Sequence, residues 1–239
     1  MANRLQINPA KTEVLWCSSA RRQHQIPSNP VRVGNTSVLP VSVVRDLGVY
    51  LDADLSMRAH ITATVRTCFA VLRQIRSVRR SLTPDAVLTL LDFCCSTLAG
   101  VSGTLLQRLQ SVLNAVARLV YSARRSEHTT PVLRQLHWLI VPERIKFRLC
   151  VLVYRCLHNK APPYLAETLH LITEVDARRR LRSASSSTLI VPSTRRSTIS
   201  DRAFPVAAAC AWSATQRQDC LVFECVSGRP QNSTVQGIV

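Results

Sequence analysis

The sequence predicts a mainly α-helical (α+β) protein with a small antiparallel β unit at the N-terminus and a disordered C-terminal tail. Apolar residues recur at helical spacing through the middle of the 239-residue chain. Short apolar runs separated by turn residues fill the first quarter, and no period is visible after residue 213. A hydrophobic content of 46% is enough to form a core.

Residues 1–57 contain the expected β unit. A strand through Val14-Leu15-Trp16 is followed by two apolar runs, 31–33 and 37–39, on either side of Gly34-Asn35. Because this pair tolerates positive φ, it predicts a hairpin turn. One further short strand is expected at about 44–51.

Helices are expected from residue 58 onward, in two groups at 58–125 and 126–175. In the first group we expect helices at 61–82 and 105–125, with another beginning at Thr83-Pro84-Asp85, where Thr83 would be the N-cap. In the second group, helices are expected from Thr130-Pro131 to Leu136 and from Val141 to His158. Residues 176–212 form a basic Ser/Arg-rich segment with one short apolar helix near its end, and 213–239 form the tail.

The charge of the chain favours a polyanionic partner, namely RNA or an RNA–DNA duplex. The formal net charge is +17, and all but three of the 31 basic residues are arginine, whose planar donors match phosphate. Two expected helices carry arginines along one side, and these are candidates for contact with a nucleic-acid backbone: Arg66, Arg73, Arg76 and Arg80, then Arg144, Arg148 and Arg155. An ordinary solvated helix face, or a GC-rich coding sequence, would produce the same residues.

Three acids in the stretch VVRDLGVYLDADLSMRAH raise the question of a metal site. Asp46 and Asp52 would lie six residues apart on one strand, too far to share an ion at about 3.3 Å per residue. Asp52 and Asp54 lie where the strand gives way to a turn, which is typical of solvated aspartate and of helix capping. We therefore expect no metal site and no cofactor in this chain.

Other chemistry also lacks the necessary residues. The nine cysteines include no CxxC pair, which favours buried thiols in an intracellular protein, cytoplasmic or nuclear and not secreted. No nucleophile elbow or glycine-rich phosphate loop is present, so no small-molecule substrate is expected. No apolar run approaches the roughly 20 residues of a membrane span.

Several stretches resemble the C-terminal part of non-LTR (LINE-type, CR1/jockey-like) retrotransposon reverse transcriptases. They are NPAKTEVLW, VRDLGVYLDADLSMRAHI, FCCSTLAGVSGTLLQRLQSVLNAVARLV, HTTPVLRQLHWLIVPERIKFRLCVLVYRCLHNKAPPYL and RLRSASSSTLIVPSTRRSTISDRAFPVAAACAW. They occur in the family's order and cover roughly residues 5–212.

The resemblance implies roles by position. Lys11 matches a lysine near the incoming nucleotide, and the primer-grip hairpin that positions the growing DNA end is matched by Leu47, Gly48, Val49 and Asp52. Residues 1–57 would then be the end of the palm and the primer grip, 58–125 the thumb, and 126–175 a post-thumb region. The intact family enzyme is an RNA-directed DNA polymerase that uses Mg²⁺.

The departures from the family pattern bear on activity. The catalytic Asp-Asp pair would lie upstream of Leu5, and the chain contains no Asp-Asp. Polymerase chemistry needs convergent carboxylates, so the chain alone is expected to be inactive as a transferase. The sequence leaves three alternatives: a fragment of a transposable-element reverse transcriptase that retains primer–template grip, a non-catalytic basic nucleic-acid-binding protein, or a non-functional product of a decayed element.

Overall fold

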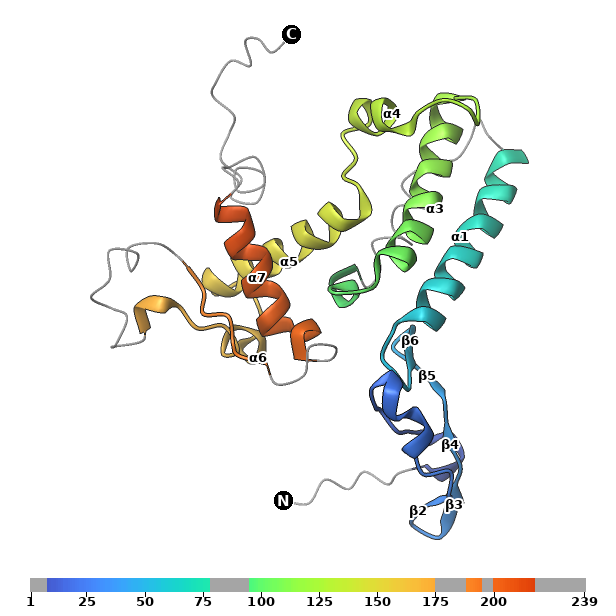
Figure 1. Cartoon of the computed structure of the whole chain (residues 1–239), viewed down its shortest axis with the longest axis vertical. Coiled ribbons are helices and arrows are strands. Elements are labelled where there is room, and N and C mark those ends of the chain that lie inside the picture. The colour runs from blue at the N-terminus through green and yellow to red at the C-terminus, as the bar shows by residue number, and fades with distance from the viewer. Residues whose placement is uncertain (1–7, 78–94, 175–187, 195–199, 218–239) are drawn as a thin grey trace. The chain divides into compact units, whose positions relative to one another are not determined.

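The computed structural model describes residues 8–77, 95–174, 188–194 and 200–217, and it is mainly helical with a few short strands (Figure 1). The chain divides into two compact units. The first comprises residues 1–94 and 101–141, and the second comprises 95–100 and 142–239. Each unit is described by itself below.

Three two-stranded sheets form the N-terminal part of the first unit. β2 (Val31–Val33) and β3 (Thr36–Val38) form the predicted antiparallel hairpin, with Gly34 at φ 61° in its turn. β5 (Val43–Asp46) and β6 (Val49–Asp52) form a second antiparallel hairpin.

Two expectations about these strands are wrong. β1 (Val14–Leu15) pairs with β4 (Pro40–Val41) in parallel, so the β unit is not wholly antiparallel. The single strand expected at 44–51 is instead a hairpin, because a turn at Leu47-Gly48 reverses the chain.

The helical part of the first unit is built on α1 (Arg58–Ser77), α3 (Gly103–Tyr121) and α4 (Thr129–Gln135). α1 packs on β6 and on α3, and α3 also packs on α4. Three of the five residues expected on the apolar stripe of α1 are buried, namely Cys68, Leu72 and Ile75, and Ile61 is buried as well. Val65, also expected there, is half-buried, and Phe69 is exposed. On α3 the predicted stripe is buried at Leu105, Leu109, Val112, Leu113 and Val116. Leu119 and Val120, expected on the same stripe, lie half-buried and exposed at the end of α3.

α1 and α3 run in the same direction. Arg108, near the start of α3, donates a hydrogen bond of 3.1 Å from Nη1 to Oγ1 of Thr62 in the first turns of α1. Arg73 and Arg76 of α1 line a cleft together with Arg118 and Ser122 at the other end of α3. The C-terminal ends of the two helices are therefore neighbours.

The second unit contains α5 (Val141–Leu157), α6 (Pro163–Ala166) and α7 (Phe204–Arg217). Only the first residue of α5, Val141, belongs to the first unit. Cys150 of α5 and Thr215 of α7 are both buried, and their Sγ and Oγ1 atoms lie 3.3 Å apart. Ile145, Leu149, Val153 and Cys156 are buried as predicted, and Leu152 is half-buried.

α7 continues to Arg217, whereas the sequence placed the start of the tail at residue 213. Trp212 and Thr215 are buried, so the last turns of this helix belong to the core of the second unit. The remainder of the expected tail, the helix expected to begin at Thr83 and the candidate residue Arg80 lie outside the described residues.

Candidate nucleic-acid interface

The tip of the β5–β6 hairpin is a two-residue turn. Asp46 pairs with Val49, and the two turn residues, Leu47 and Gly48, have φ values of 45° and 86°. Positive φ at both positions is the geometry that matches the twist of a hairpin. Leucine rarely adopts it, and the Leu47 side chain is 91% exposed. This turn presents an apolar tip on a short, well-paired hairpin.

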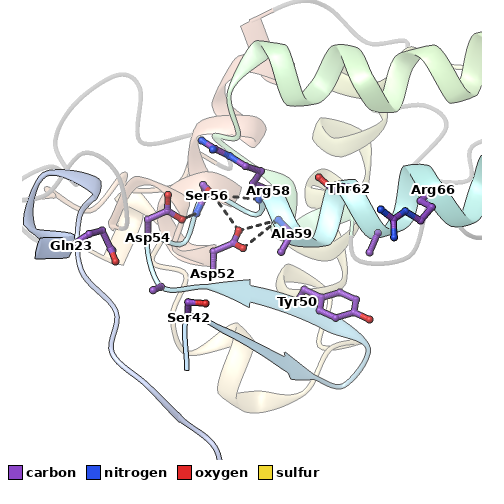
Figure 2. Close-up of a pocket in the computed structure, with 12 residues that line it drawn as sticks. Gln23, Ser42, Tyr50, Asp52, Asp54, Ser56, Arg58, Ala59, Thr62 and Arg66 are labelled. Atoms are coloured by element: carbon purple, nitrogen blue, oxygen red, sulfur yellow. Dashed lines mark hydrogen bonds between the residues drawn. The ribbon is translucent and has the colours of Figure 1, made fainter. Parts of the chain in front are cut away.

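Asp52 ends β6 and holds the first turn of α1 (Figure 2). Its carboxylate oxygens accept hydrogen bonds from the backbone N–H of Ala59, at 3.2 and 3.3 Å, and from the hydroxyl of Ser56 at 3.2 Å. Ala59 is in the first turn of the helix, where backbone N–H groups have no partner within the helix. Asp52 is thus a capping group, as its position in a turn predicted, but it is buried and not solvated.

Asp54 also has a local structural role. Its Oδ1 accepts a 3.0 Å hydrogen bond from the backbone N–H of Ser56 in the loop between β6 and α1. That loop contains Leu55 and Met57, both with positive φ. Positive φ is unfavourable for leucine and methionine, so the hydrogen bonds of Asp52 and Asp54 stabilise a loop conformation that its sequence alone would not favour. Asp46 lies on the other strand, at the opposite end of the hairpin from Asp52.

An open cavity of about 640 Å³ lies where the hairpin meets α1. Tyr50 of β6 lines it together with Arg58, Thr62 and Arg66 of α1, as Figure 2 shows. Tyr50 makes a cation–π contact with Arg45, its cross-strand partner, whose guanidinium carbon lies 5.6 Å from the ring centroid. The cavity thus combines an aromatic ring with two exposed arginines.

The exposed face of α1 is an arginine stripe, which we define as Arg58, Arg66, Arg73 and Arg76. Thr62 and Phe69 complete a series in which each residue follows the last by three or four positions, so all six share one face. The stripe is about 27 Å long at 1.5 Å per residue. The whole of α1 contains no Asp or Glu, so nothing on this helix balances the charge.

His60 lies in the first turn of α1, on the face opposite the arginine stripe, and is only 4% exposed. Its Nδ1 is buried with no hydrogen-bond partner among the described residues. Burial lowers the pKa of His60 below its ordinary value, and the nearby Asp52 carboxylate opposes this by raising it. The desolvation cost is the larger effect, so the neutral imidazole is favoured in the folded protein.

The other candidates from the sequence are placed as follows. Lys11 is exposed in a short 3₁₀ turn, Pro9–Lys11, and does not line the cavity at the hairpin. Arg148 and Arg155 are exposed on α5, and Arg144 is half-buried on the same face. These α5 residues belong to the second unit, whereas the arginine stripe belongs to the first.

Sequence reasoning did not name Arg58 or Tyr50, which line the cavity at the hairpin, nor Arg118 or Arg125, which line the cleft between α1 and α3. The spacing could have identified Arg58, because it lies eight residues before Arg66, with Thr62 midway between them. Tyr50 required knowledge of the hairpin register, and Arg118 and Arg125 required the packing of α3 on α1.

Within the described residues, no group of three or more His, Cys, Asp or Glu side chains is placed to hold a metal ion. None of the described helices is long and apolar enough to cross a bilayer. Of the six cysteines described, Cys17 and Cys210 are exposed, and the buried ones are Cys68, Cys95, Cys150 and Cys156. Burial raises the pKa of the Cys68 thiol to about 11, so this thiol is not a ready nucleophile.

Comparison of the chain with models of protein families, with curated proteins and with solved structures finds no match.

Proposed function

We propose that this protein grips a nucleic-acid duplex, preferably RNA–DNA, through the phosphate backbone, in the manner of the primer-grip and thumb region of a LINE-type reverse transcriptase. The observation that carries the proposal is the arginine stripe: four exposed arginines on one face of a helix that has no acidic residue. Phosphate contact by arginine is independent of base sequence and supplies most of the affinity for non-specific binding.

The β5–β6 hairpin supports this proposal because it is fixed to the same helix. The Asp52 carboxylate joins the end of β6 to the first turn of α1, so the hairpin and the start of the arginine stripe are held in a fixed arrangement. A duplex turn is about 34 Å long, and the stripe extends over about 27 Å. The stripe is therefore long enough to meet the phosphates of both strands where their backbones cross it.

The proposal involves no polymerase chemistry. Among the described residues the two buried or half-buried carboxylates beside the hairpin, Asp52 and Asp54, are engaged by backbone N–H groups. A capping carboxylate that moved to bind Mg²⁺ would leave the first turn of α1 without its acceptor. The expected role is to hold the duplex, and Lys11 is not assigned a part in it.

The test is fluorescence anisotropy of the whole chain with a labelled RNA–DNA duplex between 50 and 300 mM NaCl. Four phosphate contacts predict that the affinity falls with salt with a log–log slope of about −3 to −4. The double variant R58Q/R66Q removes two charges at the hairpin end of the stripe and should lower the slope by about 2.

The matched control is Arg134→Gln, a charge removal on exposed α4 away from the stripe. It should change the slope by much less than the stripe variants change it. An affinity that does not depend on salt, or a control that weakens binding as much as R58Q/R66Q, would contradict the proposal.

A further inference from the structure

A second cavity, of about 570 Å³, lies between α1 and α3 near their C-terminal ends. Four arginines line it: Arg73 and Arg76 from α1, Arg118 from α3, and Arg125 from the segment after α3. We call it the arginine cleft. Its volume is in the range of about 300–1,000 Å³ that is usual for small-ligand sites.

The charge of the arginine cleft is not balanced by protein groups. No acidic side chain lines it among the described residues, and neither α1 nor α3 contains Asp or Glu. The parallel C-terminal ends of two helices supply about one negative charge in total, at about −0.5 each. Four guanidinium groups exceed this several-fold, so the cleft retains a large positive excess that an anion would neutralise.

Arg118 is held in position for an additional ligand. Its Nη2 donates a 3.3 Å hydrogen bond to the backbone carbonyl of Glu127, and its Nε is buried without a hydrogen-bond partner among the described residues. Arg118 as a whole is half-buried and lines the cleft, so the accessible part of its guanidinium can donate to an anion there. Because one side of this group is already fixed, little side-chain entropy would be lost on binding.

Phe69 adds an aromatic ring to the cleft, which a site for a simple anion would not need. It follows the same face of α1 as Arg73 and Arg76, lines the cleft and is 37% exposed. An aromatic ring beside several arginines is the combination on which nucleic-acid bases stack while their phosphates are neutralised.

We propose that the arginine cleft binds a nucleotide that carries a terminal phosphate, with the phosphate on Arg73, Arg76, Arg118 and Arg125 and the base against Phe69. A terminal phosphate has close to two negative charges near neutral pH, whereas a backbone phosphodiester has one. The proposal goes beyond duplex gripping, because it concerns a phosphate end inside a cavity and not the backbone along an exposed face.

The experiment is calorimetric titration of the whole chain, at low salt, with AMP, adenosine and inorganic phosphate. AMP is expected to bind at least about tenfold more tightly than adenosine, since a charge-assisted contact is lost with the phosphate. Phe69→Ala should weaken AMP binding while leaving inorganic phosphate binding unchanged. The double variant R118Q/R125Q should weaken AMP and inorganic phosphate by about tenfold or more.

The controls separate the cleft from general charge and from misfolding. Arg134→Gln removes one charge outside the cleft and should leave AMP binding unchanged. Arg125 is exposed, so Arg125→Gln alone tests the cleft in a chain whose core is intact. AMP binding that both cleft variants leave unchanged, or that Arg134→Gln weakens equally, would overturn the proposal.

Two sources of the phosphate are distinguished by comparing single strands with a 5′-phosphate and a 5′-hydroxyl. A preference for the 5′-phosphate that R118Q/R125Q removes identifies a strand end as the ligand. Binding of AMP without such a preference identifies the free nucleotide. R58Q/R66Q, whose residues lie outside the cleft, should weaken the two strands equally and leave AMP binding and the ratio of the two strand affinities unchanged, so failure of the duplex proposal is separable from failure of this one.

Discussion

At the scale of single residues, the stretch between β6 and α1 shows how a carboxylate can look catalytic and be structural. Asp52 and Asp54 lie in a cavity beside arginines and a tyrosine, which are common companions of an active-site acid. Their oxygens nevertheless accept hydrogen bonds from Ala59 and from Ser56. The turn position of these acids predicted a capping role; the particular N–H that Asp52 reaches, seven residues further on, depends on a loop with two positive φ values.

His60 makes the stability of the first unit depend on pH. Its pKa is lowered in the folded protein by burial, so the unfolded chain, with a pKa of about 6.5, binds the proton more readily. The free energy of unfolding should therefore be highest above pH 7 and should fall as pH decreases below about 6.5, by at most about 1.4 kcal/mol per pH unit from this group.

The measurement is urea unfolding of wild type and His60→Gln at pH 7.5, 6.5 and 5.5. The wild type should lose more stability than the variant over this range. Exposed His24→Gln serves as the matched control and should retain the wild-type slope. If the free energy of unfolding depended on pH equally in the wild type and in His60→Gln, folding would not lower the pKa of His60.

At the scale of elements, periodicity predicted the helices better than turn residues predicted the strands. The stripes on α1, α3 and α5 depend only on side chains three or four residues apart, which the sequence displays directly. The reversal at Leu47 required positive φ at a leucine, against its local preference, and the parallel pairing of β1 with β4 joins segments about 25 residues apart. The arginine cleft likewise needs two helices to meet, so no local pattern could predict it.

The segment 95–100 gives a prediction about an element boundary. Gly100 has φ 67°, and a Cβ placed there would lie 2.9 Å from Cγ of Arg202. Arg202 in turn donates from Nε to the carbonyl of Ala99 at 3.1 Å. Gly100→Ala should destabilise the protein by about 1–2 kcal/mol through the positive φ and by about 1 kcal/mol more through the displaced Arg202.

Gly34→Ala is the matched control, because Gly34 has φ 61° but open space where a Cβ would stand. Gly34→Ala should lower the free energy of unfolding only through the positive φ, by about 1–2 kcal/mol. Urea unfolding of both variants gives the difference. A Gly100→Ala chain as stable as Gly34→Ala would mean that Arg202 moves aside without loss.

At the scale of the whole molecule, the net charge of +17 acts on the free protein and on the complex in opposite directions. Like charges repel within the folded chain, and salt screens that repulsion over a Debye length of about 10 Å at 0.1 M. The Tm of the free protein should therefore rise as NaCl increases from 50 to 300 mM. A bound duplex neutralises part of the charge and stabilises the folded state, by about 2.7 kcal/mol at a duplex concentration of 100 times Kd.

Salt releases that duplex, so the Tm of the complex should fall over the same range in which the Tm of the free protein rises. The two curves should converge near 300 mM NaCl, where the added stability from binding is lost. The measurement is thermal unfolding followed by circular dichroism, with R58Q/R66Q as the comparison. In that variant the Tm of the free protein should rise less between 50 and 300 mM NaCl, because there are fewer like charges to screen. The duplex should also raise the Tm of the variant by less than it raises that of the wild type. A free-protein Tm that is independent of salt would show that repulsion among the arginines does not limit the stability of the folded chain.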